Sequence, residues 1–196
     1  MKQNFLLSFM FMLLPIMANA WSQHEEKFTE IDGIYYRLLG GNTSYNAVVT
    51  CKSIITTESL DEEYDDPVSA NYSGSLIIPS EVTYNGITYP VTSIHRWAFY
   101  GCSNLTSISI PSSVTTIYPN TFEVTAWYNN QPDGLLYIGN ILYKYKGTMP
   151  ENASITLRDG TSAIIDGAFS GCSNLFSITI PNSVQDIGYN AYNGCI

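Results

Sequence analysis

The sequence predicts a β-rich solenoid, in which short parallel strands stack one above another along an array. Two segments are nearly identical: AFYGCSNLTSISIP at residues 98–111 and AFSGCSNLFSITIP at residues 168–181 share 11 of 14 positions. Apolar side chains also recur at an interval of 23 residues, as from Ile94 to Ile117 and from Ile164 to Ile187. A unit this short cannot bury its own apolar face, so its copies are expected to stack.

Each repeat is expected to form one short parallel strand. Ile108 and Ile110 alternate with serine, which is the period of a strand with one buried face. Pro111 has no backbone N–H for the next ladder bond and should end the strand. By the same pattern, strands are expected at residues 76–78, 108–110, 155–157 and 178–180.

The length of the repeat indicates a leucine-rich-repeat array, because a period of 23 lies within that class's range of 20–29 residues. Two hairpin insertions are expected to interrupt the array, at residues 83–89 and 135–145. The first contains Asn85-Gly86 between β-forming residues, a strong hairpin signal, and the second turns at Gly139-Asn140. Residues 21–74 are expected to form an N-terminal β-rich cap, and residues 75–196 the array.

The repeat resembles one known family closely. The pattern AFxGCSNLxSIxIPxSVxxI occurs at residues 98–117 and 168–187 and resembles the BspA-type leucine-rich repeat. The resemblance covers about residues 75–196. It implies an exported or cell-surface protein of a Bacteroides-like bacterium that takes part in adhesion or binds a host protein. The family has no shared catalytic residues, so the resemblance implies a binding protein, with no enzyme activity and no cofactor.

The chain stops one element short of a full repeat. Cys195-Ile196 follows the aromatic-x-Gly-Cys signal, but the Ser-Asn-Leu motif and its strand do not follow. Two interpretations stay open: the array is truncated at Ile196, or its last turn is exposed or paired with a partner.

The N-terminus predicts export. Residues 1–20 combine Lys2, an apolar run over residues 5–17 and the small-x-small site Ala18-Asn19-Ala20, which together are typical of a signal peptide. The apolar run is too short to span a bilayer comfortably. Removing Lys2 with this segment changes the net charge from −9 to −10. So acidic a protein would be repelled by a phosphate backbone, which argues against a nucleic-acid partner.

The cysteines are expected to be thiols. Cys102, Cys172 and Cys195 share one position of the repeat, so stacked buried thiols are the favoured interpretation. A bridge between Cys172 and Cys195 is the alternative, since adjacent strands lie about 4.8 Å apart. Cys51 has no assigned place.

No residue pattern predicts catalysis or a metal site. The two histidines, His24 and His95, have no catalytic partner at a recognisable spacing and no zinc-ligand spacing. The acidic run at residues 61–66 lacks the glycine-punctuated spacing of a calcium loop and is interpreted as solvated.

The ligand-binding residues stay unknown at this stage, although the chain is rich in tyrosine. Those in or beside the insertions are candidates for a binding patch, but ordinary cross-strand packing is favoured. They are Tyr84, Tyr89, Tyr128, Tyr143 and Tyr145. The sequence thus favours a protein-binding or adhesion module with an extracellular or host protein as partner. A carbohydrate-binding or cell-envelope structural protein is the alternative.

Overall fold

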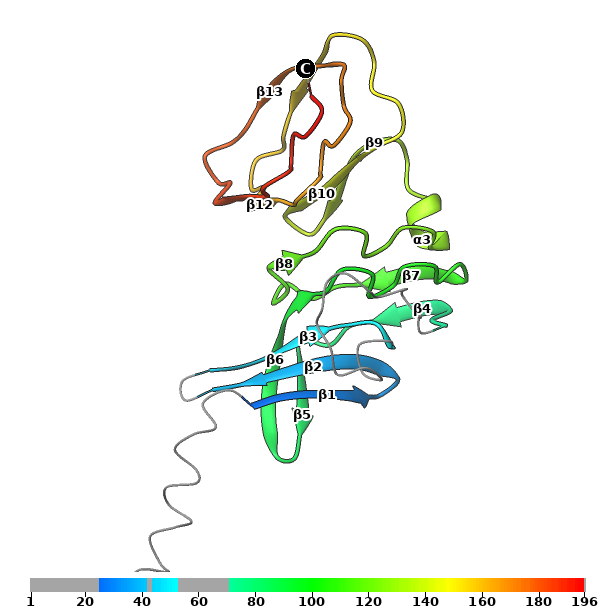
Figure 1. Ribbon diagram of the computed structural model, residues 1–196, viewed down its shortest axis with the longest axis vertical. Coiled ribbons are helices and arrows are strands. Elements are labelled where there is room, and N and C mark those ends of the chain that lie inside the picture. The colour runs from blue at the N-terminus through cyan, green and yellow to red at the C-terminus, as the bar shows by residue number, and fades with distance from the viewer. Residues whose placement is uncertain (1–24, 42–43, 53–70, 196) are drawn as a thin grey trace, which may run out of the picture.

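The computed structural model describes residues 25–41, 44–52 and 71–195. The expected signal peptide, His24 and the acidic run at residues 61–66 lie outside them. β1 (Glu25–Ile31) lies at one end of the long axis and β13 (Leu175–Thr179), near the C-terminus, at the other, while β5 (Glu81–Tyr84) reaches back to the β1 end (Figure 1). The described chain is β-rich and has a leucine-rich-repeat-like architecture, which confirms the predicted fold class at this level.

A six-stranded sheet forms the N-terminal end. Its order is β1-β2-β3-β6-β5, and β8 pairs with β6 beside this path. In β2, the alternate residues Ile34, Tyr36 and Leu38 are buried, as expected for a strand that presents one face to the core. The strands are β1 (Glu25–Ile31), β2 (Ile34–Gly40), β3 (Tyr45–Val49), β5 (Glu81–Tyr84), β6 (Ile87–Ile94) and β8 (Thr116–Ile117).

Two parallel pairs of strands carry the repeat motif: β4 (Gly74–Ile77) pairs with β7 (Leu105–Ser109), and β11 (Ala153–Thr156) pairs with β13 (Leu175–Thr179). The expected bounds of all four strands were wrong by two or three residues at the start. The strands begin where the preceding turn closes, as when Leu105 N donates to Cys102 O at 2.9 Å. They end one residue early; after β4 and β11 the next residues, Ile78 and Leu157, are buried, whereas after β7 and β13 Ile110 is partly buried and Ile180 is exposed.

The turns also contain a second strand that the sequence did not predict. The two-residue strands β8, β12 (Ala163–Ile164) and β14 (Asp186–Ile187) lie across the turn from the repeat strands. β12 and β14 pair in parallel, with Ala163 opposite Asp186 and Ile164 opposite Ile187. The expectation of one strand per turn was therefore incomplete, because a two-residue strand leaves almost no periodic signal in the sequence.

Both hairpins belong to the stack. The β5–β6 hairpin turns at Asn85-Gly86, where both residues have positive φ. β9 (Gly134–Ile138) and β10 (Ile141–Lys146) form the second hairpin, in which β10 also pairs in parallel with β12. The sheet order is β14-β12-β10-β9. Each hairpin thus supplies a strand to the stack, which keeps its backbone N–H and C=O groups paired.

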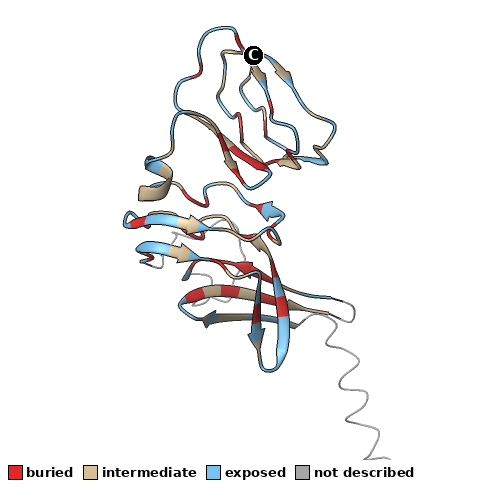
Figure 2. Ribbon diagram, turned by 180° about the vertical axis from the view of Figure 1, so that it is seen from behind, coloured by how far each residue is buried: buried red, intermediate tan, exposed pale blue. Residues whose placement is uncertain are grey.

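Aromatic rings run through the core along the array. Phe99 and Phe122 stack with ring centroids 5.5 Å apart, and Phe169 and Tyr192 stack at 5.4 Å. The three phenylalanines are fully buried. In Figure 2 the buried residues lie on the inner sides of the turns, whereas the ends and turn tips are exposed. The ladder of repeat strands is interrupted between β7 and β11, where the short helix α3 (Ala126–Asn129) packs beside β7.

Candidate binding surfaces

The outward faces of the repeat strands carry mostly hydroxyl side chains. In register, the exposed pairs across β4 and β7 are Ser75–Ser107 and Ile77–Ser109, and those across β11 and β13 are Ser154–Ser177 and Thr156–Thr179. The Ser154 and Ser177 Oγ atoms lie 3.0 Å apart and form a hydrogen bond. We call these two surfaces together the strand face.

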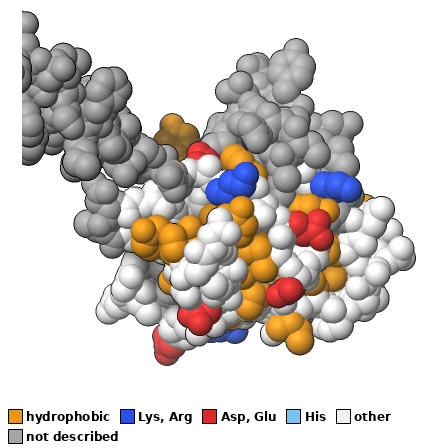
Figure 3. Space-filling view, turned by 90° about the horizontal axis from the view of Figure 1, so that it is seen from below, with side chains coloured by type: hydrophobic (Ala, Val, Ile, Leu, Met, Phe, Trp, Pro, Cys, Tyr) orange, Lys and Arg blue, Asp and Glu red, His pale blue; other side chains and the backbone are white. Residues whose placement is uncertain are grey.

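The strand face has no charged residue on its four strands, although the chain has a net charge of −9. It also presents two large apolar side chains, Phe176 and Ile77, which are 76% and 71% exposed. The end of the molecule formed by β1 and β5 differs: acidic, basic and hydrophobic side chains intermingle there (Figure 3). Its edge strand β1 includes Glu26, Lys27 and Glu30, and charged side chains protect such an edge against strand addition.

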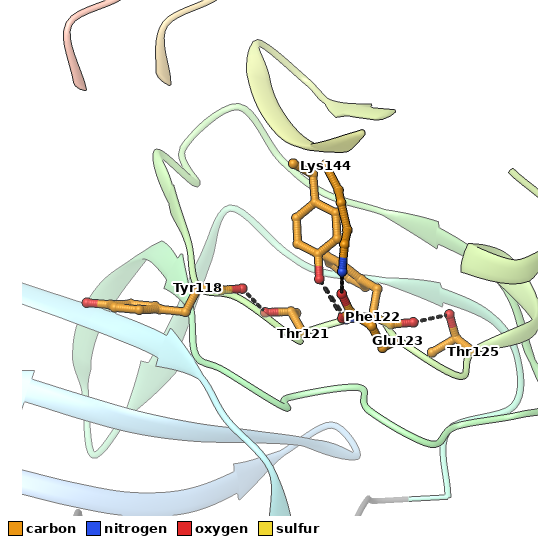
Figure 4. Close-up of polar contacts among 7 residues, drawn as sticks. Tyr118, Thr121, Phe122, Glu123, Thr125 and Lys144 are labelled. Carbon is orange, nitrogen blue, oxygen red and sulfur yellow. Dashed lines mark hydrogen bonds and ion pairs between the residues drawn. The ribbon is translucent and has the colours of Figure 1, made fainter. Parts of the chain in front are cut away.

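A polar cluster joins the turn after β8 to β10 (Figure 4). The Glu123 carboxylate accepts a hydrogen bond from Tyr143 Oη at 2.7 Å and forms an ion pair with Lys144 Nζ at 3.1 Å. Phe122 N donates to the same carboxylate at 3.2 Å. Next to it, the buried Thr121 and Thr125 hydroxyls donate to backbone carbonyls of the same turn. Because Glu123 and its partners come from successive levels of the stack, the cluster fixes the two levels against each other.

Burial in this cluster changes the acidity of Tyr143. Removal from water raises the pKa of the Tyr143 phenol far above its ordinary value, and the nearby Glu123 carboxylate raises it further. The folded protein therefore keeps Tyr143 protonated at a pH where an unfolded tyrosine is ionised.

We expect stability to fall with rising pH above about pH 10, the pKa of a tyrosine in the unfolded chain. Below that pH both states are protonated and the stability is fully present. Above it the unfolded state alone releases the proton, so the free energy of unfolding falls by about 1.4 kcal/mol per pH unit for this residue. Urea unfolding at pH 8, 10 and 11 measures how steeply the free energy of unfolding falls with pH. Tyr143→Phe should make this slope shallower by about 1.4 kcal/mol per pH unit, the contribution of one proton. An unchanged slope in that variant would show that Tyr143 ionises equally in both states.

Two hollows lie along the turns beside this cluster. The first, of about 390 Å³, is lined by side chains from several turns, including Asn120, Glu123, Lys144, Asp166, Asn190 and Asn193. The second, of about 380 Å³, includes Tyr128, Tyr145, Met149 and Asn174 in its lining. Lys144 and Ser170 line both hollows, so we describe them together as the turn groove.

The five tyrosines singled out in the sequence do not form one patch. Tyr143 and Tyr89 are buried, and Tyr89 packs edge-on against Tyr45 at a centroid distance of 5.4 Å. Tyr128 and Tyr145 are half-buried and line the second hollow. The exposed Phe176 and Ile77 escaped the sequence analysis, because both occupy positions that vary between repeats.

None of the four cysteines forms a disulfide in the structure. Cys51 and Cys102 are buried, whereas Cys172 and Cys195 are partly buried and belong to successive turns. Cys195 Sγ donates to Phe169 O at 3.3 Å. Burial raises the pKa of the Cys102, Cys172 and Cys195 thiols, which disfavours the reactive thiolate.

His95 packs between turns. Its ring lies 5.7 Å from that of Tyr118, and Nδ1 is 3.1 Å from Arg96 O. Among the described residues, no group of three His, Cys, Asp or Glu side chains is placed to hold a metal ion. In the same part of the chain, no helix has the length and apolar character needed to cross a membrane.

Comparison with known families identifies the repeat. Residues 138–196 match the family model described as BspA type leucine rich repeat region (6 copies). These residues are a BspA-type leucine-rich-repeat region. The BspA-type region contains β10 to β14, one of the two near-identical motifs and most of the turn groove. A comparison with curated proteins finds no match.

Three solved structures are similar to the chain over most of its length. A leucine-rich repeat protein from Bacteroides ovatus is 26% identical, with 85% of this chain covered, 33% of that chain covered and a TM-score of 0.39. A leucine rich cell surface protein from Faecalibacterium prausnitzii is 17% identical, with coverages of 87% and 47% and a TM-score of 0.40. The pneumococcal vaccine antigen PcpA is 12% identical, with coverages of 86% and 48% and a TM-score of 0.36. The chain thus spans between a third and a half of the length of these proteins.

Proposed function

We propose that this chain is an exported adhesion or protein-binding module that holds an extracellular or host protein on its strand face. The observation that carries the proposal is the composition of that face: hydroxyl side chains, no charge, and exposed Phe176 and Ile77. The central part of a protein interface is depleted in charged residues and enriched in aromatic ones. The family supports a binding role as well, since a BspA-type repeat brings no catalytic residues with it.

The proposal includes a division of the chain. Residues 1–20 serve as a signal peptide that directs export, residues 21–74 cap the first turn, and residues 75–196 form the repeat array with a period of 23. The pairing of Ser154 with Ser177, 23 positions apart, supports that period. The apolar N-terminal run supports export to the cell surface or the medium.

Surface plasmon resonance tests the strand face directly. Laminin, type I collagen and fibronectin are immobilised in separate channels, and the full chain is passed over each. We expect at least one channel to bind, and the double variant Ile77→Ser/Phe176→Ser to weaken that binding at least tenfold, because truncating a central aromatic contact costs about 2 kcal/mol or more.

Tyr189→Ser is the matched control, since Tyr189 is 97% exposed but lies outside the four repeat strands. This control should bind as the unchanged chain does. Equal weakening by both variants, or no binding in any channel, would contradict the assignment of protein binding to the strand face.

A further inference from the structure

We propose that the turn groove binds a neutral oligosaccharide, at a site separate from the strand face. The groove is built from four successive levels of the stack, which contribute Glu123, Lys144, Ser170 and Asn193 in order. β10, β12 and β14 pair at a spacing of about 4.8 Å, so Lys144, Ser170 and Asn193 extend over roughly 10 Å, and Glu123 adds a further level through its ion pair with Lys144. That length suits a chain of sugar rings better than a single ring.

The polar residues of the groove match the hydrogen bonding of sugar hydroxyl groups, each of which both donates and accepts. The exposed Asn120, Asn190 and Asn193 side chains each offer an amide that also donates and accepts. Asp166 accepts Asn190 N–H through Oδ1 at 2.8 Å, and its second carboxylate oxygen is a further acceptor. Four planar polar groups therefore converge on the first hollow.

The second hollow adds an apolar surface of the kind that sugar C–H groups contact. The half-buried rings of Tyr128 and Tyr145 line it, with Met149 beside them. Both rings are held in place: Lys146 Nζ lies 5.5 Å from the centre of the Tyr128 ring, and the Tyr145 ring lies 6.4 Å from that of Phe169. A groove with polar groups at one part and fixed aromatic rings at the other has the pattern of an oligosaccharide site.

Charge in the groove favours a neutral sugar. Glu123 and Asp166 are acidic, and the Lys144 ammonium is already paired with Glu123 at 3.1 Å. The other cation of the lining, Lys146, lies in the second hollow, where its ammonium donates to the backbone carbonyls of Asn129 and Gln131. An anionic sugar would bring a further negative charge next to two carboxylates in an already acidic protein. Such a like-charge contact disfavours binding.

A peptide fits this groove less well. Peptides that add to an array use unpaired backbone edges or apolar sockets. Here the backbones of adjacent turns bind each other, with Phe169 N donating to Ala191 O at 2.7 Å and Gly171 N to Asn193 O at 2.8 Å. Apart from the half-buried Tyr128 and Tyr145 rings, the large apolar residues of the lining include Ile165 and Met149, which are buried and offer no open socket.

Fluorescence polarisation with the full chain and labelled cellohexaose, maltohexaose and mannohexaose tests the proposal, with hexagalacturonate as the anionic probe. At least one neutral hexaose should bind in the micromolar to low-millimolar range. The double variant Asn190→Ala/Asn193→Ala should weaken that binding at least tenfold. The control Asn104→Ala/Asn182→Ala removes two exposed asparagines that do not line either hollow and should leave binding unchanged.

Three outcomes would overturn the proposal: no neutral hexaose bound at millimolar concentration, equal binding by the two double variants, or tighter binding of hexagalacturonate. Capture of peptides from a labelled casein digest that only Asn190→Ala/Asn193→Ala abolishes would assign the groove to peptides instead. The strand-face variant Ile77→Ser/Phe176→Ser should bind the hexaose normally, so the two proposed sites are tested independently.

Discussion

Replacing Phe122 with alanine should lower the free energy of unfolding by about 3–5 kcal/mol, the largest effect expected for a single substitution in this chain. Phe122 is fully buried and contacts three aromatic rings. Ring centroids lie 5.5 Å away for Phe99, 5.0 Å for Trp127 and 5.3 Å for Tyr143. The alanine would therefore leave a cavity where the turn after β8, helix α3 and strand β10 meet.

Urea unfolding followed by circular dichroism measures this loss. Phe176→Ala is the matched control, because it removes the same atoms from a side chain that is 76% exposed. That control should change the free energy of unfolding by no more than about 0.5 kcal/mol. Similar losses for the two variants would mean that Phe122 is not packed in the core as the structure places it.

Replacing Gly188 with alanine should destabilise the last turn by about 1–3 kcal/mol. A Cβ atom at Gly188 would lie 2.1 Å from Asp166 N and 2.4 Å from Asp166 Cα, both of which belong to the backbone of the preceding turn. A flexible side chain can move aside, but a backbone cannot move without breaking its own pairing. The hydrogen bond from Gly188 N to Ile164 O, 2.8 Å long, should be lost first.

Hydrogen–deuterium exchange of the peptide covering residues 186–195 reports this local loosening. Tyr118→Ala is the control, because Tyr118 occupies the corresponding position of an earlier turn and is exposed. Exchange of that peptide should accelerate in Gly188→Ala and stay unchanged in the control. Normal exchange in Gly188→Ala would show that the last turn does not lie as close to Asp166 as the structure describes.

The core could be predicted from the sequence because its signal is periodic. Phe99, Phe122 and Phe169 recur at one position of the repeat, and all three are fully buried. The motif at residues 168–187 also predicted the family, which the match over residues 138–196 confirms. Core positions can be recognised in the sequence because each repeat must bury the same face against the next.

The candidate sites could not be predicted in the same way. The turn groove collects residues from separate turns. Gly171 to Asn174 belong to the repeated motif, whereas Asp166 and Ser170 stand at positions where the repeats differ. Phe176 and Ile77 likewise replace small or polar residues of other repeats. These residues come together only because the fold places their turns side by side. The amino-acid sequence does not show which turns become neighbours.

The sequence by itself determined the repeat, its inward-facing residues and the family, because stacking imposes one pattern of burial on every turn. The tertiary structure alone decided how the levels join. It showed that β6 and β10 pair within the stack and that Glu123 links the turn after β8 to Tyr143 and Lys144. It also showed why residue 188 must be glycine, although earlier turns carry His95, Tyr118 and Ile165 at that position. The space beside a residue is set by the neighbouring turn's backbone, and that distance is absent from any pattern of residue types.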